Sequence, residues 1–161
     1  TIRRWRSWHR YKELIREHRS EMKPEAVEEI ELGARLSGED VSRAMERQAR
    51  LMARMRTFFE QYEFLLCAVN QVPPFDAAEP WPKVIDGVAM EHYVAWMRSA
   101  YWITVTFSPS VSVPAGFTPD GLPVGIQIVG RYRADFRVLQ MAHAFEEATQ
   151  FGRRRPAIAG G

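Results

Sequence analysis

Hydrophobic residues recur every three or four positions through the N-terminal part of the chain, which is the spacing of one face of an α-helix. The spacing predicts a helix over residues 3–20, a short acidic helix over residues 24–36 and a long helix whose apolar stripe runs over residues 41–62. Ser37 is followed three residues later by Asp40, a spacing that resembles a capping box. We therefore expect the long helix to begin at these two residues.

The period of the pattern then changes. Residues 64–69 form a continuous apolar run, FLLCAV, which is too short for a buried helix and predicts a strand covered on both faces. Residues 70–87 contain four prolines and predict a long extended loop. Residues 90–103 carry bulky apolar side chains on or near one helical face, so they predict another helix.

Two strands and a helix are predicted for the C-terminal part. The strands are SVSV at residues 110–113 and PVGIQIVG at residues 123–130, separated by turns rich in proline and glycine. Gly125 has no side chain, so we expect another group to approach its backbone closely. We expect Asp135 to cap the final helix and Gly152 to end it. The inward residues of that helix are predicted to be Phe136, Leu139, Ala142 and Phe145.

The amino-acid composition indicates the class of protein but says little about the chemistry that the protein performs. The chain of 161 residues is 46% hydrophobic and 26% charged, which is typical of a soluble globular protein. No apolar run approaches the length that crosses a bilayer, so no membrane partner is expected. The single cysteine, Cys67, cannot form an internal disulfide, which favours a reducing, cytoplasmic location.

Charge is unevenly distributed although the net charge is only +2. Residues 1–19 are basic and residues 20–40 are acidic. A basic segment can bind nucleic acid or acidic lipid, but no aromatic-and-glycine RNA motif accompanies this one. We therefore expect its charges to pair with the acidic segment rather than with nucleic acid.

Residues 110–149, SVSVPAGFTPDGLPVGIQIVGRYRADFRVLQMAHAFEEAT, resemble the C-terminal segment of the amidase signature family. In that family a strand ending in Ser-Val-Pro is followed by Gly-Phe, a turn, Gly-Leu-Pro-Val-Gly-x-Gln-x-Val-Gly and a helix that ends near Phe-Glu. The resemblance is closest over residues 107–156 and looser over residues 57–106.

The resemblance implies hydrolysis or transfer of carboxamides. Family members use a serine nucleophile, a second serine in a cis peptide and a lysine, all in a Gly/Ser-rich segment of the N-terminal half of a longer chain. Here the lysines are Lys12, Lys23 and Lys83, and no serine has a glycine-rich neighbourhood that resembles an oxyanion hole. No catalytic residue of the family can therefore be assigned to this chain. No cofactor is expected, and no metal site, since His143 has only Glu146 or Glu147 at helical spacing.

The resemblance also implies a fold class: α/β, the C-terminal part of the amidase-signature fold, with amphipathic helices packed on a few buried strands of a larger mixed sheet. We expect residues 1–161 to be a single region, an incomplete amidase domain. It would comprise helices over residues 1–62, strands, a proline-rich loop and a helix over residues 63–130, and a C-terminal helix and tail over residues 131–156.

Trp96 and Gln127 are the candidate substrate-binding residues. Trp96 lies on the predicted helix before the last strands, where the family tends to build its substrate side, and Gln127 is the only polar side chain on its strand. Core packing or a satisfied backbone hydrogen bond is the alternative interpretation of both. Cys67 is interpreted as a buried, inert thiol. The arginines at 153–155 either stabilise the negative end of the last helix or bind an anion.

Two positions depart from the family pattern. Phe107 stands where glycine is common before the final strands, and Ala68 replaces the customary proline of the buried strand. We expect Phe107 to fill space that glycine leaves open in other members, which would change the shape of any neighbouring pocket.

Three functions follow from these observations. The first is the C-terminal segment of an amidase-type amidohydrolase, which acts on a small-molecule amide once it is completed by the N-terminal part. The second is a non-catalytic remnant or interaction module that self-associates into a homo-oligomer through its unpaired strands. The third is a basic helical nucleic-acid binder that uses residues 1–19.

Overall fold

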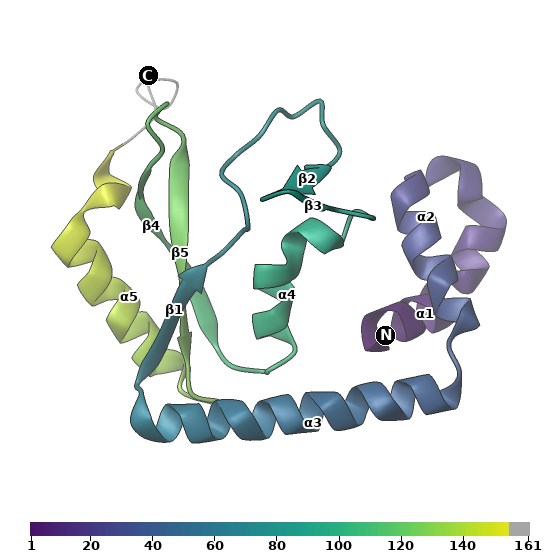
Figure 1. Ribbon diagram of the computed structural model, residues 1–161, viewed down its shortest axis with the longest axis horizontal. Coiled ribbons are helices and arrows are strands. Elements are labelled where there is room, and N and C mark those ends of the chain that lie inside the picture. The colour runs from purple at the N-terminus through teal and green to yellow at the C-terminus, as the bar shows by residue number, and fades with distance from the viewer. Residues whose placement is uncertain (155–161) are drawn as a thin grey trace. The chain divides into compact units, whose positions relative to one another are not determined.

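The chain divides into two compact units, Thr1–Leu51 and Met52–Gly161. The structure is a computed structural model that describes residues 1–154 (Figure 1). The long helix α3 (Gly38–Gln61) begins in the first unit and ends in the second. No helix among the described residues combines the length and the apolar character needed to span a membrane.

The first unit contains α1 (Ile2–His18), the 3₁₀ turn η1 (Arg19–Glu21), α2 (Pro24–Glu31) and η2 (Leu32–Arg35), followed by the start of α3. Pro24 occupies the first turn of α2, where its missing N–H costs no hydrogen bond. The core of the unit consists of Ile15, Val27 and Ile30, with Trp8, Tyr11 and Met22 packed against it.

The predicted capping box at the start of α3 is confirmed. The Ser37 hydroxyl oxygen accepts a hydrogen bond from the Asp40 backbone N–H at 3.1 Å, and the Asp40 carboxylate accepts one from the Ser37 backbone N–H at 3.0 Å. The Ser37 hydroxyl also donates to that carboxylate, and together with the backbone bond and Arg43 it lowers the pKa of Asp40 to about 2. The cap therefore fixes the first residue of the helix.

Basic and acidic residues of the first unit pair with each other, as the charge pattern predicts. The Arg4 guanidinium donates two hydrogen bonds to the Glu29 carboxylate, at 3.1 and 2.7 Å, and Glu29 is buried. Arg19 of η1 pairs with Glu31 of α2. Part of the positive charge of residues 1–19 is therefore neutralised by internal ion pairs.

The second unit is built on a three-stranded antiparallel sheet with strand order β1-β5-β4. The strands are β1 (Phe64–Ala68), β4 (Ser110–Phe117) and β5 (Pro123–Gly130). Helix α5 (Asp135–Thr149) packs on one face of β4 and β5 (Figure 1). The core on that face comprises Val113, Ile128, Val138 and Ala142.

Two predictions about burial in this unit are wrong. Strand β1 lies at the edge of the sheet and Leu66 is 45% exposed, so among the described residues β1 is not covered on both faces. On α5, Phe136 is 72% exposed and Leu139 is also exposed, because the sheet takes the neighbouring stripe through Val138 and Ala142. The hydrophobic periodicity therefore predicted the position of α5 but not which face of the helix packs on the sheet.

The segment between β1 and β4 holds more regular structure than predicted. A hairpin of β2 (Val84–Ile85) and β3 (Val88–Ala89) interrupts the expected loop. Its turn is Asp86-Gly87, both with positive φ (48° and 73°), the combination that two-residue hairpins favour. The sequence signal was therefore present in the Asp-Gly pair.

The helix predicted over residues 90–103 begins later than expected. The 3₁₀-helix η3 (Ala95–Met97) leads into α4 (Arg98–Thr104). Met90 continues the hairpin instead, since its backbone N–H donates to the Lys83 carbonyl at 2.8 Å and the residue is buried. Tertiary burial thus overrides the local helical spacing.

The end of α5 also differs from the prediction. Asp135 is the first helical residue rather than a side-chain cap, and the left-handed Gln150 (φ 56°) ends the helix in place of Gly152. A 3₁₀ turn, η4 (Phe151–Arg153), follows. The Arg154 guanidinium lies over the Phe117 ring at 4.1 Å, whereas Arg155 and Pro156 lie outside the described residues.

Candidate functional site

Gln127 stands in the middle of a polar row that crosses the three-stranded sheet. The register places it opposite Cys67 on β1 and opposite Ser112 on β4. Since β5 alternates, and Ile126 and Ile128 pack on the α5 side, the row faces away from α5. Sequence reasoning found Gln127 but not Ser112, because the partner of a strand residue is set by register rather than by local sequence.

The side-chain amide of Gln127 is buried yet weakly satisfied. Its Nε2 donates to the Cys67 Sγ at 3.8 Å, and sulfur is a weak acceptor. Burial raises the pKa of the Cys67 thiol, so the thiol stays protonated at neutral pH. Nucleophilic chemistry needs the thiolate, and the structure thus favours the interpretation of Cys67 as inert, although its side chain is only half-buried.

The expected close approach at Gly125 is observed. A Cβ at this position would lie 3.0 Å from the Ser112 Oγ and 3.3 Å from the Val113 carbonyl oxygen. The group that approaches is therefore the neighbouring strand β4, at the same polar row.

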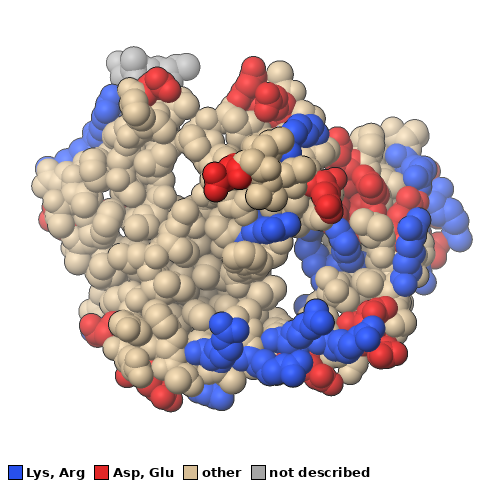
Figure 2. Space-filling model, in the orientation of Figure 1, with Lys and Arg blue, Asp and Glu red and all other residues tan. Residues whose placement is uncertain are grey.

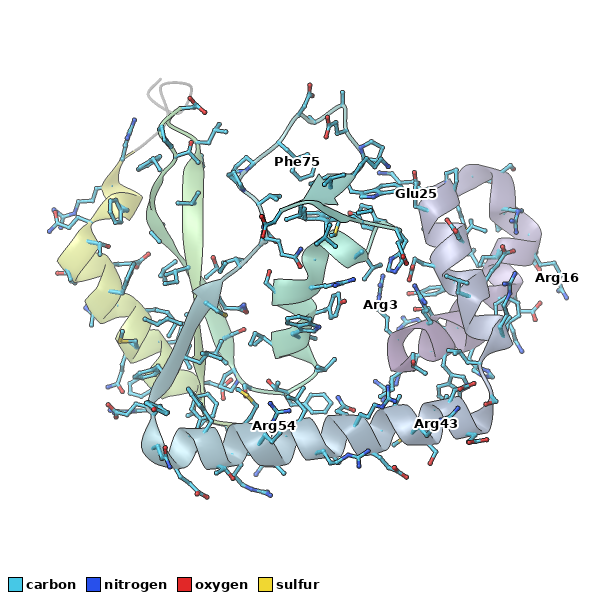
Figure 3. The ribbon with its side chains drawn as sticks, in the orientation of Figure 1. Arg3, Arg16, Glu25, Arg43, Arg54 and Phe75 are labelled. Carbon is cyan, nitrogen blue, oxygen red and sulfur yellow. The ribbon has the colours of Figure 1, made fainter. Side chains whose placement is uncertain are left out.

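Trp96 belongs to a row of edge-to-face aromatic rings. Its ring lies 5.5 Å from that of Phe75, on the loop after β1 (Figure 3), and 6.5 Å from that of Tyr93. Tyr93 in turn meets Trp81 at 6.1 Å, and the Lys83 ammonium lies 3.0 Å above the Trp81 ring. The sequence analysis missed Phe75, Trp81 and Tyr93 because they lie in a segment assigned to an extended loop or to the start of a helix.

The indole N–H of Trp96 is buried and has no hydrogen-bond partner among the described residues. Buried polar groups are usually satisfied, so this donor is available to an acceptor that the described chain does not supply. Trp96 and Gln127 are not joined by any ring contact or hydrogen bond within residues 1–154. They are two separate candidate positions of the second unit.

Phe107 does not fill internal space as expected. Its side chain is 55% exposed, and its backbone is left-handed, with φ of 57°. Glycine adopts this conformation without steric cost, which gives a physical reason for glycine at the equivalent position of other family members. The departure at Phe107 therefore concerns the backbone and the surface rather than the core.

The remaining candidates do not form a reaction centre. Lys83 lies over an aromatic ring, and Lys12 and Lys23 belong to the first unit. Among residues 1–154 no group of three His, Cys, Asp or Glu side chains is arranged to hold a metal ion.

Comparisons with known proteins place the chain among amidases. The amidase family model matches residues 7–139. An acylamidase of Rhodococcus erythropolis is 31% identical over 140 residues, which are 86% of this chain and 29% of the relative. One subunit of the glutamyl-tRNA(Gln) amidotransferase of Ralstonia nicotianae is 59% identical over 49 residues, which are 30% of this chain and 10% of the relative.

Solved structures agree with this result. A bacterial aryl acylamidase of the amidase signature enzymes superposes with a TM-score of 0.80 at 25% identity, over 93% of this chain and 34% of that one. A second solved amidase has a TM-score of 0.80 at 21% identity, which supports the fold alone. The chain thus spans no more than about a third of the length of these relatives.

Proposed function

The chain belongs to the amidase family, and from this membership we propose that it is the C-terminal segment of an amidohydrolase that cleaves carboxamide C–N bonds. The Ser–cis-Ser–Lys centre that the family uses would lie on sequence other than these 161 residues. The chain would contribute part of the sheet, helices that cover it and a portion of the acyl-side pocket.

One observation carries this proposal: 93% of the chain superposes on 34% of a solved aryl acylamidase. The sheet with α5 therefore has the geometry of an amidase part, while its own lysines and serines supply no reaction centre. We propose that residues 1–161 act as one incomplete amidase domain despite their two compact units, and that the assembled enzyme acts on small amides in the cytoplasm.

Trp96 and Gln127 are proposed to contact the substrate. The buried indole N–H of Trp96, which has no partner among the described residues, supports this role because a carboxamide oxygen is a suitable acceptor. The weak sulfur contact of Gln127 supports it as well, because its side-chain carbonyl oxygen can accept from an amide N–H. Each would orient the substrate rather than take part in bond cleavage.

A self-associating module is the second candidate function. The observation that favours it is the pair of outer strands, β1 and β4, each of which has one strand partner within the described residues. Unpaired edges can join two copies of a chain as readily as they join a chain to a different partner.

Turnover measurements test the first proposal. The chain alone should hydrolyse benzamide-type and short aliphatic amides no faster than background, whereas the chain mixed with the part of the Rhodococcus acylamidase outside the matched segment should hydrolyse them. In that mixture Trp96→Phe should raise KM because it removes the N–H donor, and it should lower the stability of the chain modestly because it also removes one ring of a partly buried indole. Trp5→Phe in the first unit is the matched control and should leave KM unchanged.

Two results would contradict the proposal. One is turnover by the chain alone that a single substitution within it abolishes, since this would reveal a missed reaction centre. The other is the absence of both activity and association in the mixture.

A further inference from the structure

Three large apolar side chains are exposed where α4 leads into β4. Trp102 is 59% exposed, Val105 36% and Phe107 55%. We call these residues, together with the outer edge of β4 at Ser110 and Ser112, the α4–β4 surface. A contiguous exposed apolar patch marks an interaction site, and these three side chains fall within residues 102–107.

The backbone at Phe107 is held in an unfavourable conformation. A non-glycine residue in the left-handed region costs about 1–2 kcal/mol relative to the right-handed one. The turn enforces this conformation, because the buried Thr106 hydroxyl donates to the Ile103 carbonyl at 2.7 Å and accepts from the Ser108 backbone N–H at 3.2 Å. Because the Phe107 ring is exposed, burial within the described chain does not compensate the cost. Strain of this kind tends to occur at binding sites.

The adjacent strand β4 has outward backbone groups with no strand partner among residues 1–154. The Gly130 backbone N–H donates to the Pro109 carbonyl at 2.9 Å, one position before the first pair of the β4–β5 register, Ser110 opposite Val129. Because hydrogen-bonded and non-hydrogen-bonded pairs alternate in antiparallel sheets, the N–H and C=O groups of Ser110 and Ser112 point away from β5. Pro114 follows at the next outward position, where its missing N–H leaves no ladder bond unmade.

The α4–β4 surface also lacks the charges that usually protect a sheet edge. Residues 99–119 contain no Asp, Glu, Lys, Arg or His. Figure 2 shows a broad uncharged area over the strands and α4, whereas Lys and Arg gather along α3. An uncharged edge next to exposed aromatic rings is suited to another protein surface and not to nucleic acid or lipid headgroups.

We propose that the α4–β4 surface is the docking site for the part of an amidase that this chain does not span. This inference rests on the proposed function, and its occupant follows from the 34% of the solved aryl acylamidase that the chain covers. The partner adds a strand along Ser110 and Ser112 and buries Trp102, Val105 and Phe107. Binding energy from the Phe107 ring then offsets the strain of its backbone.

Phe107→Gly separates docking from stability, because it removes the ring and relieves the backbone at once. The probe is the part of the Rhodococcus acylamidase outside the matched segment, and its Kd for the chain is measured by sedimentation. Phe107→Gly should raise the thermal midpoint of the isolated chain yet raise Kd by about tenfold or more, as for an interface aromatic. Trp102→Ala should also raise Kd, with little effect on the isolated chain.

Gln150→Gly is the matched control, because Gln150 is also left-handed (φ 56°) and lies at the end of α5. It should raise the thermal midpoint and leave Kd unchanged. Amide hydrogen exchange at Ser110 and Ser112 should slow when the probe binds. An unchanged Kd for Phe107→Gly, or unchanged exchange at the two serines, would overturn the docking site while leaving the proposed function intact.

Two other outcomes are distinguishable. No binding of the unchanged chain to the probe would contradict the proposed function itself and the docking site with it. A dimer of the isolated chain that Phe107→Gly dissociates and that the probe does not displace would show that a second copy, rather than the amidase part, occupies the surface.

Discussion

At Phe107 a bulky side chain occupies a backbone position that suits glycine, with φ of 57°. The cost of that conformation does not appear in the residue's contacts, since the ring is largely exposed and its truncation would leave no buried cavity. A similar lesson applies to Asp40, whose importance lies in the backbone group and hydroxyl that it satisfies. Single residues of this chain therefore matter through local geometry as much as through burial.

The Asp40 carboxyl gives the first unit a defined pH dependence. Its pKa falls from 3.8 to about 2 in the folded state, chiefly because the Ser37 hydroxyl and backbone donate to the carboxylate. A lowered folded pKa means that the stabilisation is complete above pH 3.8 and is lost as the pH falls through about 2. Asp40→Asn should therefore be less stable than the unchanged chain at pH 7, and the difference should shrink over that interval.

Urea unfolding of the two proteins between pH 2 and pH 7, followed by the helical signal, measures this difference. Ser37→Ala should reproduce the effect, because it removes the largest contributor to the lowered pKa. A constant difference between Asp40→Asn and the unchanged chain across the whole range would show that the carboxylate charge is not responsible.

At the scale of elements, close packing decides which segments can lie together. Gly33 of η2 meets the backbone of α1, since a Cβ there would contact the Arg4 carbonyl oxygen and lie 2.7 Å from the Arg4 carbonyl carbon and 2.8 Å from the Trp8 Cβ. Gly130 plays the same part in the second unit, where a Cβ would meet Val138 of α5. In both units a glycine thus sets how closely a helix approaches its neighbour.

Gly33→Ala should destabilise the first unit by about 1–3 kcal/mol, as overpacking of a close contact does. The reason is that backbone atoms of α1 cannot give way as a flexible side chain can. Gly38→Ala at the start of α3 is the matched control, because a Cβ there meets nothing within 4 Å and alanine favours the helix. Denaturant titration measures the unfolding midpoints of both variants. Equal midpoints for Gly33→Ala and Gly38→Ala would contradict the close contact at Gly33.

At the scale of the whole molecule, strand edges and large apolar side chains remain uncovered within the described residues. Both outer strands of the sheet have a free edge among the described residues. Exposed aromatic residues such as Phe136 on α5 and Trp102 on α4 add to this surface. The chain covers only 34% of a solved aryl acylamidase, and under the proposed function the rest of the enzyme would cover this surface.

The isolated chain should therefore be oligomeric, prone to aggregation or partly molten, and addition of the remaining amidase part should reverse this behaviour. Sedimentation velocity at several concentrations, with and without that part, measures the effect. A clean monomer with a sharp unfolding transition that does not depend on concentration would instead favour an independently folded protein.

The sequence by itself determined the features that depend on neighbours a few residues away. The Ser37–Asp40 cap, the proline start of α2 and the strand at residues 123–130 follow from local hydrogen bonds, fixed φ and alternation, so local reasoning found them. The family resemblance over the last strands was equally readable, because its motif is continuous in the chain.

Only the tertiary structure decided what distant segments do to one another. Packing determines which stripe of α5 the sheet covers, and strand order puts β1 at an edge. Strand register puts Gln127 opposite Cys67 and Ser112 in one polar row. The tertiary structure also delayed the helix before β4, because Met90 is held by the Lys83 carbonyl. These outcomes depend on strand register and on competition between faces of similar apolar character, and neither is encoded in a local window of sequence.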